Sequence, residues 1–152
     1  MKTLLLVLLA TASLAALTGC NRSFAESTAS APEVAPAAHY KAGHGLQLTP
    51  TASKFIGLTI GEVGSRDIGD SKAAPAVPTA ALLRTVKGDF VYVSNGGWML
   101  RTPVTVGVSD SAWTEIKDGL YEGDSIVING VQALWMAELQ AVNGGVGCAD
   151  GH

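Results

Sequence analysis

Apolar and polar residues alternate in short runs over positions 77–130, and glycines separate the runs. The runs are rich in β-branched and aromatic residues, which are typical of strands that have one buried face. Strands are expected at 90–93, 98–101, 104–106, 113–116 and 125–128. The Asn-Gly-Gly turn at 95–97 favours a tight hairpin because Asn-Gly readily adopts positive φ, and Pro103 is expected to interrupt the chain between two strands. The pattern predicts a compact antiparallel β unit.

A second apolar segment precedes this unit. Leu46 and Leu48 alternate with polar neighbours and predict a short strand, and 58–63 predicts another. Between them, Thr49 can cap a helical turn that has Pro50 at its first position, where the missing N–H costs nothing.

Beyond residue 130 the apolar positions follow a helical spacing. They fall at 131, 134, 135, 139 and 142, which predicts a helix over 131–142. The expected fold is therefore mainly β, a small antiparallel β domain with one short helical turn and a C-terminal helix.

The stretch 64–76 separates the two apolar segments. It is rich in Gly, Ser, Asp and Pro, which is typical of a linker. Closing such a gap costs little free energy, because the cost rises only with the logarithm of the loop length. We therefore expect one split domain over 46–142, formed by 46–63 and 77–142, with a flexible tail at 143–152.

The N-terminus has the form of a secretory signal. Lys2 precedes a run of leucines, and positions 17–20 are Leu-Thr-Gly-Cys, which looks like a bacterial lipobox. In that interpretation the signal peptide 1–19 is removed and Cys20 carries a lipid that anchors the chain to a membrane. The alternative is an ordinary cleaved signal followed by an incidental cysteine. Residues 20–45, rich in Ala, Ser and Pro, are expected to form a lipidated flexible tether.

Composition and charge argue against some classes of partner and of protein. Once the leader with its single lysine is removed, nine of the ten basic residues remain against thirteen acidic ones. No run of Lys and Arg is present, so nucleic acid is not an expected partner. The mature sequence has no apolar stretch long enough to predict an internal transmembrane helix.

A series of short motifs occurs in a fixed order along both apolar segments. It comprises Leu-Thr-Pro at 48–50 and Ile-Gly-Leu at 56–58, then Pro78, Phe-Val-Tyr-Val at 90–93, Arg-x-Pro-Val-x-x-Gly at 101–107 and Glu-Ile-x-x-Gly-Leu-x-x-Gly-Asp-x-Ile-Val-x-x-Gly at 115–130. This order resembles the membrane-proximal region of periplasmic adaptor proteins. These are the HlyD-like membrane fusion proteins of resistance-nodulation-division heavy-metal efflux systems, and the match is to the cobalt–zinc–cadmium type.

The resemblance implies a truncated adaptor. A full adaptor carries a lipoyl-like domain, a helical hairpin and a β-barrel between the two segments, where this chain has only 64–76. The implied function is docking on an inner-membrane metal/proton efflux pump in support of transmembrane export, with a full-length adaptor as a further partner. Strand edges and the turns at 95–97 and 119–124 are the expected contact surfaces. The resemblance implies a periplasmic location, and the choice between inner and outer membrane stays open.

The C-terminal tail contains three candidate metal ligands. Cys148, Asp150 and His152 alternate with small residues and could converge on a soft or borderline divalent metal such as Zn or Cu. The alternative is a chain end with an incidental cysteine. His39 and His44 could also bind a metal, although solvated histidines are the commoner case. A metal site would favour a second function, a free-standing periplasmic metal-binding lipoprotein that buffers or delivers metal.

Catalytic motifs are not evident in the sequence. It contains no Gly-x-Ser-x-Gly, no His-Glu-x-x-His and no phosphate-binding glycine loop, so neither an enzyme nor a resident cofactor is expected. Packing in the core is the expected role of five large side chains, Trp98, Met99, Trp113, Trp135 and Met136.

Overall fold

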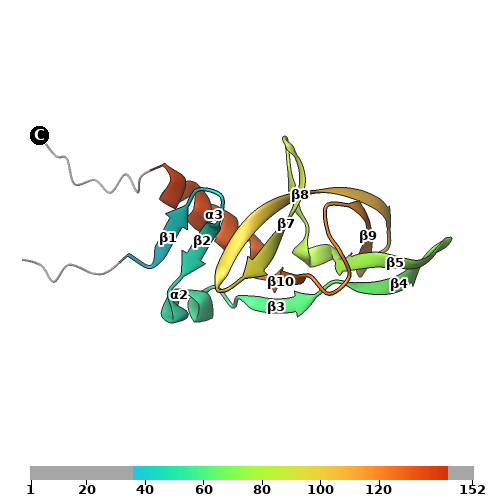
Figure 1. Ribbon diagram of the computed structural model, residues 1–152, viewed down its shortest axis with the longest axis horizontal. Coiled ribbons are helices and arrows are strands. Elements are labelled where there is room, and N and C mark those ends of the chain that lie inside the picture. Colours follow the sequence, from blue (N-terminus) through green and yellow to red (C-terminus); the bar gives the residue numbers. More distant parts are fainter. Residues whose placement is uncertain (1–35, 144–152) are drawn as a thin grey trace, which may run out of the picture. The chain divides into compact units, whose positions relative to one another are not determined.

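Antiparallel strands dominate residues 36–143, the part of the chain that the computed structural model describes (Figure 1). The elements are β1 (Ala38–Lys41), β2 (Gly45–Leu48), α2 (Pro50–Phe55), β3 (Thr59–Glu62), β4 (Gly64–Ile68), β5 (Ser71–Pro78), the 3₁₀ turn η1 (Thr79–Ala81), β6 (Leu83–Thr85), β7 (Gly88–Asn95), β8 (Trp98–Ser109), β9 (Trp113–Asp118), β10 (Ser125–Asn129) and α3 (Val131–Val142). The predicted fold class is confirmed: a mainly β domain with one short helix and a C-terminal helix.

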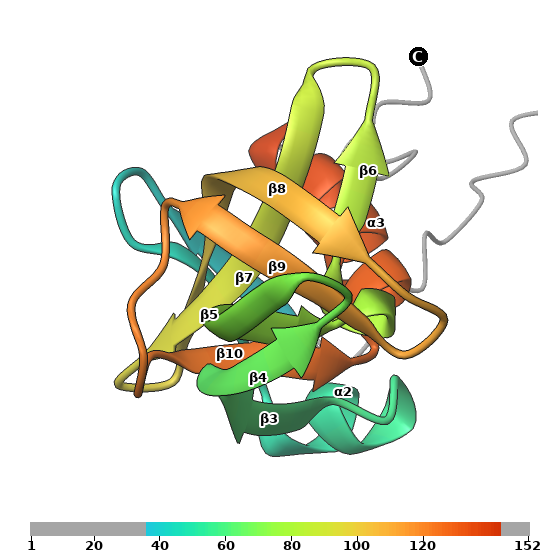
Figure 2. The same cartoon turned by 90° about the vertical axis from the view of Figure 1, so that its right-hand side faces the viewer.

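The sheet curls back toward itself (Figure 2). Its strands pair in the order β3-β10-β7-β8-β9-β5-β4, with β1 on β2, β2 on β8 and β6 on β7. The two outer strands, β3 and β4, are successive parts of one extended segment with only Val63 between them. The Val63 N–H donates to the Asp124 carbonyl at 2.9 Å, and its own carbonyl accepts from the Gly123 N–H at 2.8 Å. One segment therefore connects the two ends of the strand order.

Two hydrophobic clusters fill the two faces of the sheet. Successive residues point to opposite faces of a strand, so Val91 belongs to the first cluster and Tyr92 to the second. Ile126 and Val127 divide between the clusters in the same way. The second cluster also receives Leu134 from α3 and is covered by that helix. The core therefore has an inner part within the curl and an outer part under α3.

Both helices begin where the sequence predicts. The Thr49 hydroxyl accepts a hydrogen bond from the Ala52 N–H at 3.2 Å, and Pro50 occupies the first turn of α2. Helix α3 has the predicted bounds and follows Gly130, which has a left-handed conformation with φ of 82°.

The stretch 64–76 is not a linker, contrary to the prediction. It forms most of a β-hairpin in which Gly64 pairs with Ala76 and Ile68 with Ser71. Gly69 and Asp70 form its two-residue turn, a combination typical of tight hairpins. The polar composition of 64–76 concealed the hairpin because β4 is largely exposed and polar, although part of β5 is buried.

The expected tether also ends earlier than predicted. Residues 38–41 form β1, which pairs antiparallel with β2 from Ala38 opposite Leu48 to Lys41 opposite Gly45. The partner residues Gly45 and Leu46 of β2 are buried. Gly45 has φ of 90°, and a Cβ at this position would overlap the Met99 carbonyl of β8. A glycine is therefore what allows β2 to approach β8 so closely.

Pro103 does not interrupt its strand. Strand β8 is continuous from Trp98 to Ser109, and Pro103 lies opposite Phe90 of β7. The other edge of β8 pairs with β2 as far as Met99 and with β9 from Thr105. Pro103 lies in the interval between these two partners, where its missing N–H breaks no ladder bond.

Candidate functional site

A buried carboxylate joins α3 to the sheet. Glu138 is only 6% exposed, and its carboxylate accepts a hydrogen bond from the hydroxyl of Tyr92, which is fully buried in β7. The guanidinium Nε of Arg101 lies 3.2 Å from Glu138 Oε2. Tyr92 and Arg101 are paired neighbours on β7 and β8. The cluster Tyr92–Arg101–Glu138 therefore fixes the C-terminal helix on two adjacent strands.

The electrostatics of this cluster keep Tyr92 neutral. Burial raises the pKa of its phenol well above the ordinary value, and the hydrogen bond to Glu138 raises it further, while Arg101 opposes the rise. The Arg101 guanidinium also lies 4.9 Å from the centre of the Phe90 ring. Among the described residues, every buried side-chain nitrogen or oxygen has a hydrogen-bond partner. The cluster is fully satisfied, so its evident role is to hold the fold.

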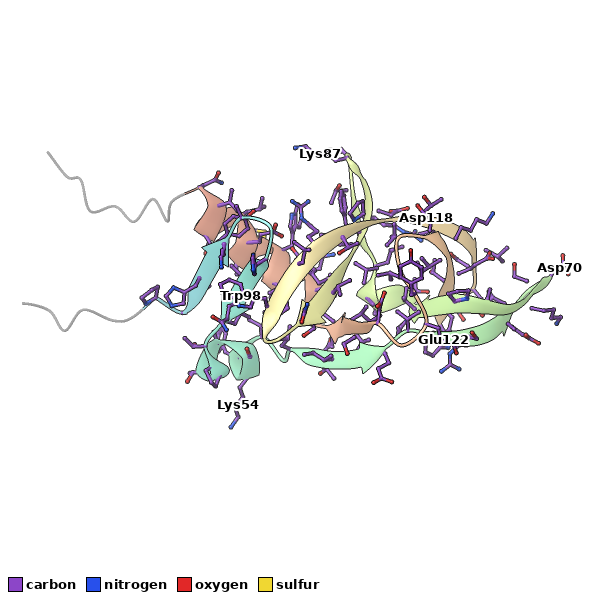
Figure 3. The ribbon with its side chains drawn as sticks, in the orientation of Figure 1. Lys54, Asp70, Lys87, Trp98, Asp118 and Glu122 are labelled. Atoms are coloured by element: carbon purple, nitrogen blue, oxygen red, sulfur yellow. The ribbon has the colours of Figure 1, made fainter. Side chains whose placement is uncertain are left out.

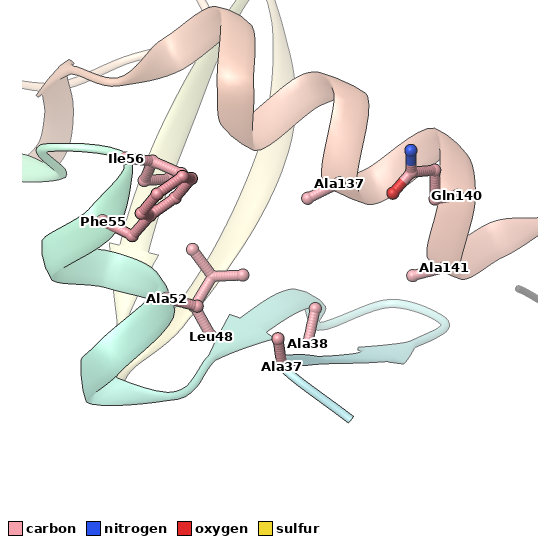
Figure 4. A pocket seen from close by; sticks show the side chains of 9 residues that line it. All are labelled: Ala37, Ala38, Leu48, Ala52, Phe55, Ile56, Ala137, Gln140 and Ala141. Atoms are coloured by element: carbon pink, nitrogen blue, oxygen red, sulfur yellow. The ribbon is translucent and has the colours of Figure 1, made fainter. Parts of the chain in front are cut away.

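An apolar groove lies between α2, the β1–β2 pair and the end of α3 (Figure 4). Its volume is about 370 Å³, and it is lined by Ala37, Ala38, Leu48, Ala52, Phe55, Ile56, Ala137, Gln140 and Ala141. The Phe55 side chain is 90% exposed although it is large and apolar. Alanines on the facing elements leave the space open. The groove is therefore a surface that an apolar partner could cover.

Acidic side chains lie toward the other end of the domain. Asp70, Asp118 and Glu122 lie on the side where β4 and β5 project, and Lys54 lies at the α2 end (Figure 3). The Ser65 hydroxyl of β4 donates to the Glu122 carboxylate at 3.0 Å. This contact links the turn at 119–124 to the hairpin.

Two carboxylates order the turns on either side of β9. Asp110 Oδ1 accepts the backbone N–H groups of Trp113 and Ala112, each at 2.7 Å. These bonds stabilise the ionised form and lower the pKa of Asp110. Asp124 Oδ2 accepts the Tyr121 N–H at 2.7 Å. Both turns therefore present a defined polar surface.

The two turns predicted as contact surfaces lie in different surroundings. Gly97, in the turn at 95–97, lines a shallow hollow with Leu48 and Ser53 near α2. The turn at 119–124 contacts β4 through Glu122. The two turns therefore have different neighbours, and whether either contacts a partner stays a prediction.

The predicted ligands and the predicted anchor are not part of the described structure. Cys20, Cys148, Asp150 and His152 lie outside residues 36–143. Over 36–143, no group of three His, Cys, Asp or Glu side chains is placed to hold a metal ion. His44 packs the edge of its ring on Trp98, with the ring centres 5.9 Å apart. The tail site and the lipidated cysteine stay predictions.

Packing roles were predicted correctly for some large side chains only. Met99 is buried, but Met136 is 52% exposed, because it lies on the outer face of α3. Trp113 is half-buried, and the Arg66 guanidinium lies 3.6 Å from its ring centre. Sequence analysis also missed Glu138. The available signal is its position four residues after Leu134, on the face of the helix that packs on the sheet.

Comparison with known proteins gave one family match and one similar solved structure. Residues 74–135 match the family model described as the YknX C-terminal permuted SH3-like domain. A solved structure is also similar, an NMR structure of a 180-residue segment with the N-terminal metal-binding site and the membrane-proximal domain of SilB from Cupriavidus metallidurans CH34. That match has 23% sequence identity and a TM-score of 0.43, and it covers 58% of this chain and 52% of the other. A search of the curated proteins found no match.

The family match covers less than half of the chain. Residues 74–135 are similar to an SH3-like domain of a membrane fusion protein, and the predicted resemblance to an adaptor is confirmed for this part of the chain. Neither helix in the described part of the chain is long and apolar enough to cross a membrane.

Proposed function

We propose that this chain is a lipid-anchored periplasmic protein that docks on an inner-membrane metal/proton efflux pump and supports its export activity. The observation that carries the proposal is the match of residues 74–135 to a membrane-fusion-protein domain. In this proposal Cys20 carries the lipid, and the role of the chain is binding rather than catalysis.

The acidic end of the domain is the proposed contact with the pump. Its turn at 119–124 is fixed by Asp124 and by the bond between Ser65 and Glu122, so little conformational entropy is lost on binding. Charged, ordered turns of this kind favour a partner with a complementary basic surface.

Site-specific crosslinking in membranes tests the docking. A photoreactive amino acid at Glu122 is expected to capture a pump subunit, identified by mass spectrometry. The same group at Val86, which is fully exposed on the β6–β7 turn, is the matched control and should capture much less. Recovery of neither a pump subunit nor a longer adaptor from position 122 would contradict the proposal.

Lipidation needs a separate measurement. Cells that produce the full chain are expected to incorporate labelled palmitate into it, and the Cys20→Ser variant should lose the label. A mature protein that begins elsewhere than at Cys20 would show that the leader belongs to an ordinary secretory signal.

A further inference from the structure

We propose that the end of the domain formed by β1, α2 and the last turns of α3 rests on an anionic lipid bilayer, with Phe55 inserted into the headgroup region. The inference rests on the proposed function, because the lipid on Cys20 is what holds the chain at a membrane. It adds an orientation: the apolar groove faces the lipid and the acidic turns face away from it.

Several large exposed apolar side chains come from the segments that form this end or adjoin it. Within the described residues, six large exposed ones come from 36–61 and 131–143, and four come from the longer stretch 62–130. The six are Tyr40, Phe55, Ile60, Met136, Leu139 and Val142. Phe55 ends a six-residue helix beside a groove lined with alanines, so its ring adds nothing to the core. An exposed aromatic ring beside an apolar groove is typical of surfaces that lie in a membrane interface.

The charges of the domain favour the same orientation. Residues 36–61 contain Lys41 and Lys54 but no aspartate or glutamate. Residues 131–143 contain one acidic residue, Glu138, which is buried and paired with Arg101. Residues 62–130 contain nine acidic and six basic residues. An anionic bilayer attracts the first surface and repels the last.

The length of chain before the domain permits this contact. Residues 21–35 separate the predicted lipid-bearing cysteine from the described domain, a distance of at most about 50 Å at full extension. The domain begins with Pro36, and the next two residues, Ala37 and Ala38, line the groove itself. An anchor on Cys20 is therefore attached at the groove end of the domain, and this end is within reach of the bilayer.

Vesicle flotation of the mature chain tests the inference without the lipid. The protein carries Cys20→Ser, so that any binding comes from the domain surface, and the vesicles contain phosphatidylglycerol and phosphatidylethanolamine. Phe55→Ser is expected to lower the partition coefficient by about tenfold or more. Tyr121→Ser is the matched control, since Tyr121 is 80% exposed in the turn at 119–124, and it should leave the coefficient unchanged.

A second pair of variants tests the charge. Lys54→Gln should weaken binding to the phosphatidylglycerol vesicles by about fivefold and leave binding to neutral phosphatidylcholine vesicles unchanged. Lys87→Gln, on the exposed β6–β7 turn, should have no effect. Phe55 and Lys54 are exposed, so the variants should melt at the wild-type temperature, which a thermal scan checks.

Three outcomes would overturn the inference. They are absence of vesicle binding by the parent protein, equal losses for Phe55→Ser and Tyr121→Ser, and a dimer in sedimentation that Phe55→Ser dissolves. The last would assign the groove to a second copy of the chain. Pump capture from position 122 and palmitate labelling at Cys20 are measured independently, so either proposal can fail while the other stands.

Discussion

The cluster Tyr92–Arg101–Glu138 provides the sharpest test of how α3 is held. Replacing Glu138 with leucine keeps the helix propensity and the approximate volume but removes the acceptor of the Tyr92 hydroxyl. Tyr92 is fully buried, so water cannot replace that acceptor. Arg101 differs, because its side chain is 30% exposed and can turn toward solvent.

The expected loss follows from these exposures. A buried hydroxyl without a partner costs about 1–3 kcal/mol, and a partly solvated ion pair adds at most about 1 kcal/mol. The leucine side chain recovers part of this through apolar burial, so Glu138→Leu should destabilise the domain by about 2 kcal/mol. For a domain of this size that corresponds to a melting temperature lower by about 8–16 °C.

A double-mutant cycle separates the free-energy cost of the unpaired Tyr92 hydroxyl from the other effects of Glu138→Leu. Adding Tyr92→Phe to Glu138→Leu removes the orphaned hydroxyl, so the double variant should regain about 1–2 kcal/mol over the single variant. Glu138→Gln is the control, since its amide oxygen still accepts from Tyr92. Thermal and urea unfolding measure the wild type, Glu138→Leu, Tyr92→Phe, the double variant and the Glu138→Gln control. A double variant no more stable than Glu138→Leu would refute the reasoning.

Three further predictions follow from single features. Folding raises the pKa of Tyr92 above its unfolded value of about 10, so the free energy of unfolding should fall as the pH rises above 10. This loss of stability at alkaline pH should be smaller in Tyr92→Phe. It should be unchanged in Tyr121→Phe, the control at an exposed tyrosine. Gly45→Ala should lower the melting temperature markedly, because the new methyl group meets a backbone carbonyl of the next strand at a positive φ; an unchanged melt would contradict this packing. If the predicted tail site binds metal, titration with Zn²⁺ should detect binding that the Cys148→Ser/His152→Ala variant loses, and equal binding by both proteins would exclude the tail.

The sequence predicts this fold well where local chemistry and burial agree. Thr49 followed by Pro50 marks the start of α2, and the helical spacing of apolar residues marks both ends of α3. The strands at 90–93 and 125–128 are found because their β-branched residues face two buried clusters. In these segments the local preference and the tertiary environment favour the same structure.

Sequence reasoning fails where a partner decides the structure. The strand from Trp98 to Ser109 passes through Pro103 because its neighbours change there, which no local pattern reveals. Glu138 is buried because Tyr92 and Arg101 happen to face it across the fold. The orientation of the apolar groove depends on elements far apart in the sequence. Such features depend on tertiary contacts rather than on propensity.

The hairpin of β4 and β5 has a consequence for how such domains can diversify. Its two turn residues, Gly69 and Asp70, are exposed, and the preceding residue, Ile68, is buried in the core. An inserted domain whose own termini lie close together could enter at this point with every existing strand pair retained. Each doubling of the inserted loop would cost only about 0.6 kcal/mol in closure entropy. The strand pairing therefore does not depend on the length of an insertion at this turn. Short and long proteins can evolve with the same β-sheet.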